Sequence, residues 1–335
     1  MSEHHTSQSL NQLIIGSWIS RAIYVAAKLR IADRLADGPR TADELAKEAG
    51  VTSRPLFRVL RALAGIGVFD QMNDSRFRLT PMGECLREDV ENSSWAFSIM
   101  LGEEQDRSWD DLLETVRTGE TAFDRVHGQS VFAFMREHPA QAQIFNTAIS
   151  NLHGQDMRAM LDAYDLSDVQ TLADIGGGVG SNLAAVLSRY PKMRGLLFDL
   201  PHVVEQAHPR LKAAGISDRY VVQGGNVFKT APIGADAYLL CDVLHDWDDE
   251  KAGLILGNLR RAMPAKARLL AIDYVLPEGG GWSFGKLLDL QMMLIPGGRE
   301  RTEAEHQHLL SSHGFRLTRL VPISSGASVI EAVPA

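Results

Sequence analysis

The sequence predicts an α/β protein in which a mostly parallel sheet, with an antiparallel last strand, follows a mainly helical region of winged-helix type. Three observations carry this prediction. Helical periodicity dominates the first hundred residues, short apolar runs alternate with helical segments after residue 171, and a glycine-rich turn follows the first of these runs. The 335 residues, 45% of them hydrophobic, suffice for about two domains.

Composition and charge exclude several classes of protein. The chain has 34 basic and 42 acidic residues, a net charge of −8, so as a whole it repels nucleic acids and anionic membranes. Its two cysteines, Cys85 and Cys241, suit a reducing compartment better than a disulfide framework. No apolar stretch approaches the ~20 residues of a membrane helix, and the start lacks the features of a signal peptide. We expect a cytoplasmic protein with neither nucleic-acid nor membrane partners.

The N-terminal region reads as helix, helix and hairpin. Residues 10–36 place apolar side chains three or four apart, which predicts a helix with one apolar face. That face consists of Leu10, Ile14, Trp18, Ala22, Val25 and Leu29. Thr41 with Glu44 fits a capping box, Pro55 begins a further helix, and residues 68–79 read as a hairpin. This order is that of a winged helix.

A winged helix suggests a DNA-binding regulator, but the charge balance disfavours that alternative. Residues 38–90 carry eight basic and eight acidic side chains, so the basic surface that DNA binding requires is missing. The apolar face of residues 10–29 has no evident partner in a winged helix of ordinary size. Such faces usually mark an interface, and we expect residues 1–100 to form a homodimer.

After a helical linker, the sequence pattern changes to alternating predicted strands and helices. The predicted strands are residues 172–175, 195–198, 220–222, 237–241 and 269–272, followed by a closing antiparallel hairpin at 315–321 and 328–333. Short, continuously apolar strands are typical of a parallel sheet that is covered on both faces. We therefore divide the chain into an N-terminal domain (1–100) expected to dimerise, a helical linker (101–165) and a C-terminal α/β domain (166–335).

A glycine-rich turn follows the first predicted strand. Glycines at 176, 177, 178 and 180 allow a ligand to approach the backbone closely. Roughly twenty residues on, Asp199 ends the second strand, where a carboxylate can accept hydrogen bonds from ribose hydroxyls. Turn and acid together predict a nucleoside site. A dinucleotide-dependent dehydrogenase is disfavoured because Ser181 stands where the dinucleotide fingerprint requires its third glycine.

A second group of polar residues follows the strand that ends at Cys241. In open α/β sheets ligands bind at the carboxyl ends of strands, which places His245 at the functional edge. It could be a loop histidine bonded to Asp246, or a general base whose ring is oriented by Asp273 and Glu300.

These motifs together resemble the S-adenosylmethionine-dependent O-methyltransferases of the plant caffeate and hydroxyindole type and their bacterial relatives that act on phenazines and anthracyclines. The resemblance covers nearly the whole chain through DIGGGVG, FDLPHV, GGNVF, LHDWDDE and GGRERT. It implies a Rossmann-like methyltransferase sheet, a winged-helix-like dimerisation domain, and S-adenosylmethionine as cofactor, converted to S-adenosylhomocysteine without a metal.

The resemblance also assigns residues. The catalytic base falls on His245, flanked by Asp273 and Glu300. The cofactor contacts fall on Asp174, Gly176, Gly178, Asp199, Leu200, Asn226, Val227, Cys241 and Trp247. Three positions depart from the plant pattern: Asn226 replaces an acid, Cys241 a lysine, and Asp273 a glutamate.

The expected reaction is methyl transfer to a hydroxyl of a small aromatic or polyketide-type natural product. The acceptor would lie against Phe145, Ile149, Met292 and Met293. The main alternative is a relative of the same fold that binds S-adenosylmethionine but hydroxylates or decarboxylates a polyketide. Because His245 and both acids are present, methylation is favoured.

Overall fold

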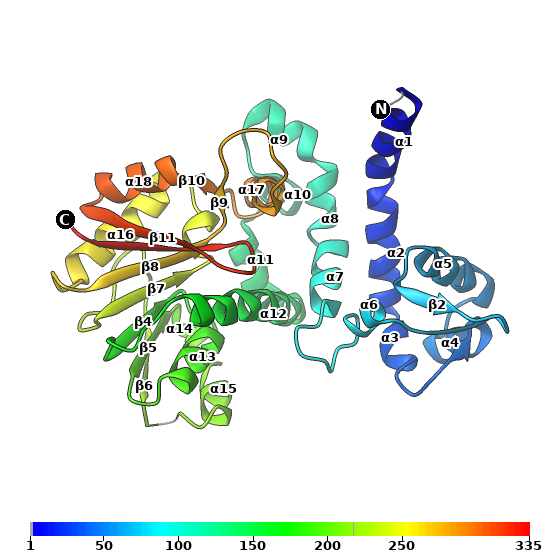
Figure 1. Cartoon of the computed structure of the whole chain (residues 1–335), viewed down its shortest axis with the longest axis horizontal. Coiled ribbons are helices and arrows are strands. Elements are labelled where there is room, and N and C mark those ends of the chain that lie inside the picture. Colours follow the sequence, from blue (N-terminus) through cyan, green and yellow to red (C-terminus); the bar gives the residue numbers. More distant parts are fainter. Residues whose placement is uncertain (1–2, 217) are drawn as a thin grey trace. The chain divides into compact units, whose positions relative to one another are not determined.

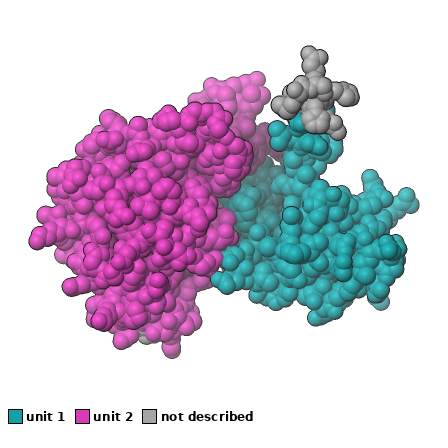
Figure 2. Space-filling model, in the orientation of Figure 1, with its two compact units in different colours: residues 1–107, 138–151 teal, residues 108–137, 152–335 magenta. Residues whose placement is uncertain are grey.

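The computed structural model describes residues 3–216 and 218–335, without the side chains of residues 3–8 and 153 (Figure 1). The chain forms two compact units, coloured separately in Figure 2: residues 1–107 with 138–151, and residues 108–137 with 152–335. The predicted linker, 101–165, is thus divided between them. Residues 108–137 belong to the second unit because α10 (Ala122–His127) packs on α17 (Phe284–Leu294). Ile144 and Phe145 instead pack in the first unit on the cluster around Trp95.

The first unit begins with helices that the sequence pattern merges into one. They are α1 (Glu3–Ile14), α2 (Gly16–Lys28) and α3 (Ile31–Arg34). The helical hydrogen bonding is interrupted at Ile15, and Arg30 takes a left-handed conformation with φ 54° that starts α3 in a new direction. The expected helix over 10–36 is therefore three helices.

The winged helix is confirmed. Its elements are β1 (Arg40–Thr41), α4 (Ala42–Ala49), α5 (Ser53–Gly65), β2 (Phe69–Gln71), β3 (Arg76–Leu79) and α6 (Pro81–Glu84). Thr41 and Glu44 form the predicted capping box, which satisfies two backbone donors at the start of α4. The buried side of α5 is Leu56, Leu60 and Leu63, as its helical spacing predicts. The three strands form an antiparallel sheet in the order β1-β3-β2.

The remaining helices before the large sheet are α7 (Trp95–Gly102), α8 (Asp106–Asp110), α9 (Leu112–Thr118), α10 (Ala122–His127), α11 (Val131–Glu137) and α12 (Pro139–Ala163). Among all helices of the described chain, none combines the length and apolarity that crossing a membrane requires.

The second unit is built on a seven-stranded sheet with the order β11-β12-β8-β7-β4-β5-β6. The strands are β4 (Thr171–Ile175), β5 (Arg194–Asp199), β6 (Tyr220–Gly224), β7 (Ala237–Cys241), β8 (Arg268–Asp273), β11 (Phe315–Pro322) and β12 (Ser328–Pro334). All pairs from β6 to β8 are parallel, whereas β12 runs antiparallel to both β8 and β11. This is the predicted parallel sheet with an antiparallel last strand.

Helices and short elements complete this unit: α13 (Ser181–Arg189), α14 (Pro201–Val204), α15 (His208–Ala213), the 3-10 turn η1 (Leu244–Asp246), α16 (Asp249–Ala262), β9 (Val275–Leu276), α17 (Phe284–Leu294), β10 (Arg301–Thr302) and α18 (Glu303–Ser312). Successive side chains of the sheet enter two separate apolar clusters. In β7, Leu239 and Cys241 belong to one cluster and Tyr238 and Leu240 to the other. Burial on both faces explains why the strand has no polar alternation.

The predicted apolar face of the first helices is exposed in the single chain. Leu10, Ile14 and Trp18 are 57%, 64% and 71% exposed, and Leu13 is 78% exposed. A run of apolar side chains this exposed is costly unless another surface covers it.

We predict that this face lies in a dimer interface. The substitution Trp18→Asp should weaken dimerisation by roughly 2 to 4 kcal/mol, the usual cost of removing a tryptophan anchor from an interface. Light scattering at micromolar concentration should report a dimer for the wild type and a monomer for this variant. Ile233→Asp, at a loop residue that is 76% exposed, is the matched control and should stay dimeric. A monomeric wild type would contradict the assignment.

Candidate active site

Polar side chains gather where the parallel strands end. Asp174 lies near the end of β4, Asp199 ends β5, Cys241 ends β7, and Asp273 ends β8. The carboxyl ends of parallel strands meet at one edge of the sheet, which is where ligands bind in open α/β folds. The sequence prediction that these residues share one edge is confirmed.

The turn after β4 requires its glycines. Gly176, Gly178 and Gly180 have φ values of 68°, 57° and 80°, in the left-handed region that other residues rarely adopt. A Cβ on Gly177 would overlap the side chains of Asp174 and Leu197. The turn is therefore a bare stretch of backbone in front of α13.

Asp199 holds the glycine turn as well as facing the ligand edge. Its Oδ2 accepts the N–H of Gly178 at 2.9 Å and its Oδ1 accepts the N–H of Leu200 at 2.6 Å. Burial raises the pKa of Asp199, and these two hydrogen bonds oppose the shift. The carboxylate is partly exposed and keeps acceptor capacity for a pair of ribose hydroxyls, so this turn and acid fit a nucleoside cofactor.

The buried acid behind the turn is Asp174. Burial first, and then the charge of Asp199, raise the pKa of Asp174 to about 7. Its buried position beneath Gly177 makes it a support of the turn, and the direct cofactor contact expected from the sequence stays a prediction.

Three other predicted cofactor contacts already have partners within the chain. The Oδ1 atom of Asn226 accepts the N–H of Phe228 at 2.9 Å, and the carbonyl of Val227 accepts a hydrogen bond from Asn258. The Cys241 thiol donates to Oδ2 of Asp242 at 3.3 Å, and burial and that neighbouring charge raise the pKa of the thiol well above its usual value. A role of these side chains toward a cofactor stays a prediction.

His245 lies in η1 and is 7% exposed. Its Nδ1 donates to Oε1 of Glu300 at 2.7 Å, while Nε2 is 3.7 Å from Oδ1 of Asp246, too far for a hydrogen bond. Burial alone would lower the pKa of His245. The charge and hydrogen bond of Glu300, with the charges of Asp246 and Asp242, outweigh burial and raise this pKa well above its usual value.

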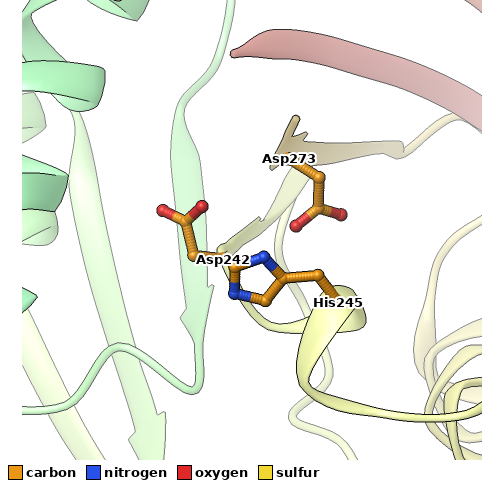
Figure 3. A group of neighbouring side chains, drawn as sticks. All are labelled: Asp242, His245 and Asp273. Carbon is orange, nitrogen blue, oxygen red and sulfur yellow. The ribbon is translucent and has the colours of Figure 1, made fainter. Parts of the chain in front are cut away.

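Asp273, the other acid expected to orient the ring, forms no hydrogen bond with the imidazole, and its role toward His245 stays a prediction. It is 1% exposed, and neither carboxylate oxygen has a hydrogen-bond partner among the described residues. Figure 3 shows this carboxylate pointing toward the imidazole of His245. Burial raises the pKa of Asp273 well above its usual value, and Glu300 and Asp242 add to the shift. Its influence on His245 is electrostatic.

The segment 297–302, which we call the clamp, fixes the turn that carries His245. A Cβ on Gly298 would overlap the carbonyl oxygen of His245, and the N–H of Arg299 donates to that same oxygen at 2.8 Å. The N–H of Glu300 donates to Asp289 at 2.8 Å. Pairing of β10 with β9 then aligns Arg301 with Val275, two residues after Asp273.

Arg301 completes the clamp, and the sequence analysis missed it. Its guanidinium, 1% exposed, donates to the carbonyls of Leu244 at 3.0 Å and Trp247 at 2.9 Å, on either side of His245. It also forms two hydrogen bonds with Oδ1 of Asp249. The available signal was the arginine that directly follows Glu300 in GGRERT.

Trp247 belongs to a group of aromatic rings. It stacks on Phe132 with centroids 5.3 Å apart, and it meets Phe228 edge-on at 4.8 Å. The predicted cofactor contact of Trp247 is not tested by this packing, which shows a structural role for one face of the indole.

The four predicted acceptor residues fall in different units. Phe145 and Ile149 belong to the first unit, and Met292 and Met293 lie on α17 in the second, where Met292 is buried and Met293 partly exposed. A common acceptor pocket stays a prediction.

Comparison with known proteins identifies the family. A model of the O-methyltransferase domain matches residues 109–316, and a model of the O-methyltransferase dimerisation domain matches residues 11–89. The chain belongs to the O-methyltransferase family. The resemblance drawn from its motifs is confirmed, as are the fold and the dimerisation domain.

One curated relative and one solved structure show how similar this O-methyltransferase is to known members. It is 45% identical to the phenazine O-methyltransferase PhzM of Lysobacter antibioticus, over 98% of this chain and 96% of that protein. The crystal structure of LaPhzM superposes with a TM-score of 0.95 at 45% identity, covering 98% of this chain and 99% of that one.

Two further relatives bear on chemistry. The neocarzinostatin O-methyltransferase NcsB1, crystallised with S-adenosylmethionine and 2-hydroxy-5-methyl naphthoic acid, is 32% identical over 94% of this chain and 96% of that one, with a TM-score of 0.83. Aclacinomycin 10-hydroxylase RdmB of Streptomyces purpurascens is 35% identical over 93% of this chain and 86% of that protein.

We predict that Asp199→Ala weakens binding of S-adenosylmethionine by ~2 kcal/mol or more, since two ribose hydrogen bonds are lost at about 1 to 1.5 kcal/mol each. The glycine turn also loses its anchor to the carboxylate. Asp162→Ala, at an exposed position of α12, is the control. Calorimetry that finds equal affinities for Asp199→Ala and the wild type would remove Asp199 from the cofactor site.

We also predict that Gly298→Ala lowers the turnover rate by about 100-fold, because a displacement of a catalytic group by about 1 Å can have that effect. Gly281→Ala is the control, since a Cβ there meets nothing within 4 Å. Steady-state kinetics should show the loss only in Gly298→Ala. Similar turnover in the two variants would mean that the clamp does not position His245.

Proposed function

We propose that the protein transfers the methyl group of S-adenosylmethionine to a hydroxyl of a small aromatic natural product, with His245 as the general base. The observation that carries this proposal is the 2.7 Å hydrogen bond from Nδ1 of His245 to Glu300 at the ligand edge of the sheet. Because Nδ1 keeps its proton for this bond, Nε2 is the nitrogen that can accept one from a substrate.

The chain contributes binding and positioning for the cofactor. The turn from Gly176 to Gly180 offers close access to backbone, and Asp199 offers its carboxylate to the ribose. S-adenosylmethionine supplies a methyl group already attached to a positively charged sulfur. The residues therefore need only to align an acceptor oxygen with that carbon and to remove a proton, and alignment alone supplies much of the rate.

His245 is suited to the proton transfer. A phenol with a pKa near 10 and an ordinary imidazole near 6.5 differ by about 3.5 units, or ~4.8 kcal/mol for complete transfer. The neighbouring acids raise the pKa of His245 and narrow this gap. Removal of the proton during methyl transfer avoids a fully formed phenolate.

We infer an aromatic acceptor from the protein's relatives and from its own residues. One related enzyme is named for phenazine, and another, NcsB1, was crystallised with a naphthoic acid. Met292 and Met293 are adaptable side chains that pack well on rings. We also propose that Phe145 and Ile149 contact the acceptor.

We further infer that the protein is a homodimer and that it is cytoplasmic. Two cysteines without a disulfide are in line with a reducing compartment.

A hydroxylase is the second candidate, because RdmB is 35% identical to this chain. The bond between His245 and Glu300 favours methylation, which needs a base at this position. The mass of the product separates the two reactions, since one adds a methyl group and the other an oxygen.

We predict that His245→Ala lowers the methylation rate by ~10² to 10⁴, the usual contribution of a positioned base, and leaves S-adenosylmethionine affinity nearly unchanged. His245→Gln should be little better, because an amide does not accept a proton at neutral pH. His308→Ala, at an exposed residue of α18, is the control. Substantial activity of His245→Ala on a weakly acidic phenol at pH 7 would show that proximity alone carries catalysis.

Glu300→Gln should shift the acid limb of the pH-rate profile to lower pH. The carboxylate stabilises the protonated imidazole, so its removal lowers the pKa of His245, and the basic form then persists at lower pH. The rate on the plateau of the profile should also fall, because the negative charge of Glu300 no longer stabilises the imidazolium that forms when His245 accepts the proton. Profiles of kcat against pH measure both effects. A limb that stays in place or moves to higher pH would contradict the pairing.

A further inference from the structure

Three buried carboxyl groups lie beside His245 and take no part in the bond to Glu300. Asp156 on α12, Asp242 after β7 and Asp273 at the end of β8, which we call the acidic triad, are 4%, 6% and 1% exposed. One carboxylate oxygen of Asp242, one of Asp273 and a ring nitrogen of His245 all lie within 4.8 Å of one another (Figure 3). Asp156 interacts electrostatically with both Asp242 and His245.

Two members of the triad, Asp156 and Asp273, feel the positive charges of His245 and Arg301. Both cations are already engaged, His245 by Glu300 and Arg301 by Asp249 and two carbonyls. Neither oxygen of the Asp273 carboxylate has a hydrogen-bond partner among the described residues, and this carboxylate points toward the imidazole of His245. Buried carboxylates of this kind are costly unless they gain a cation or protons.

The segment that carries Asp242 adjoins the glycine turn. A Cγ atom of Val243, the residue after Asp242, would be 3.0 Å from a Cβ on Gly176. Asp242 itself takes a left-handed φ of 52° and binds the Cys241 thiol through Oδ2. Residues 242–245 thus connect the surroundings of the glycine turn with the base, and carboxylate oxygens of Asp242 and Asp273 lie within 4.8 Å of a ring nitrogen of that base.

We propose that Asp156, Asp242 and Asp273 form an anionic subsite for the positively charged sulfur of S-adenosylmethionine, so that the protein binds this cofactor more tightly than S-adenosylhomocysteine. This inference rests on the proposed function. The two ligands differ only at the sulfur. In S-adenosylmethionine the sulfur carries a methyl group and a positive charge, and in S-adenosylhomocysteine it is a neutral thioether.

On this proposal a positive charge would stay beside the triad throughout the reaction. An oxygen lone pair would form the bond to the methyl carbon, the electrons of the carbon–sulfur bond would stay on sulfur, and the hydroxyl proton would pass to Nε2 of His245. The charge would thus move from sulfur to the imidazole, which has a ring nitrogen within 4.8 Å of carboxylate oxygens of Asp242 and Asp273. The triad can stabilise the system before and after transfer, and the neutral thioether is left without this attraction.

The test is calorimetry on the full-length protein with three ligands: S-adenosylmethionine, S-adenosylhomocysteine, and sinefungin, in which a carbon that bears an amino group replaces the methylated sulfur. Asp156→Asn should weaken binding of the two cationic ligands by about 10-fold or more, the range for losing one buried charged partner, and that of S-adenosylhomocysteine by less than about twofold. Asp162→Asn, with the same charge change at an exposed position of the same helix, should leave all three unchanged.

Other outcomes overturn the proposal. Equal weakening of all three ligands would assign Asp156 to the α-ammonium group that they share, and no weakening would remove it from the site. Competition of Mg²⁺ or Mn²⁺ with S-adenosylmethionine would assign the triad to a metal ion. If the wild type binds no S-adenosylmethionine, the proposed function fails too, whereas binding without a charge preference overturns only this inference.

A measurement on the wild type needs no variant. Among the described residues, the titratable and charged groups that act on one another at this site are Asp156, Cys241, Asp242, His245, Asp246, Asp273, Tyr274, Glu300 and Arg301.

Burial and the charge of Asp242 raise the pKa of Asp156 to about 7, so Asp156 holds a proton in part of the molecules at neutral pH. A cation beside it lowers that pKa and releases protons. Binding enthalpies in buffers of different ionisation enthalpy should show more proton release with S-adenosylmethionine than with S-adenosylhomocysteine. Equal release would overturn the proposal.

Discussion

The position of His245 depends on one interaction, the packing of the clamp at 297–302 across the turn at 244–246. Arg301 holds the carbonyls of Leu244 and Trp247, and Gly298 has no side chain to separate the two backbones. Only in this arrangement does Glu300 meet Nδ1 of a histidine 55 residues away in the chain. The buried guanidinium is fully paired, so the cost of burying its charge is offset by hydrogen bonds that fix the turn.

The same site is unusually rich in acids, and their charges have a common effect. The pKa values of five groups at the site are raised, so each of them holds its proton more strongly than an ordinary side chain of its kind. These groups are Asp156, His245, Asp246, Asp273 and Glu300. A reaction that begins with a positively charged sulfur and ends with a protonated imidazole is matched to such surroundings. Glu300 acts by a direct hydrogen bond, whereas Asp273 acts across space, so the two acids that the motif pairs have different physical roles.

Sequence patterns predicted the scaffold well and the supports of the site poorly. The strands of the sheet, the capping box of Thr41 and the ligand edge at Asp199 and His245 follow from local periodicity and strand order. The division of residues 101–165 depends on packing between distant segments, which leaves no local pattern. Asp156 was missed because a lone acid in a helix resembles any solvated residue, and only the fold brings it near Asp242.

The most direct test of the account is the fate of the methyl group. The protein is incubated with S-adenosylmethionine deuterated in its methyl group and with a panel of hydroxylated phenazines, naphthoic acids and anthraquinones, and the products are measured by mass spectrometry. Our account predicts a product that carries the intact deuterated methyl group on oxygen and an equal amount of S-adenosylhomocysteine. A product that gains an oxygen atom or loses carbon dioxide, with S-adenosylmethionine unconsumed, would contradict it.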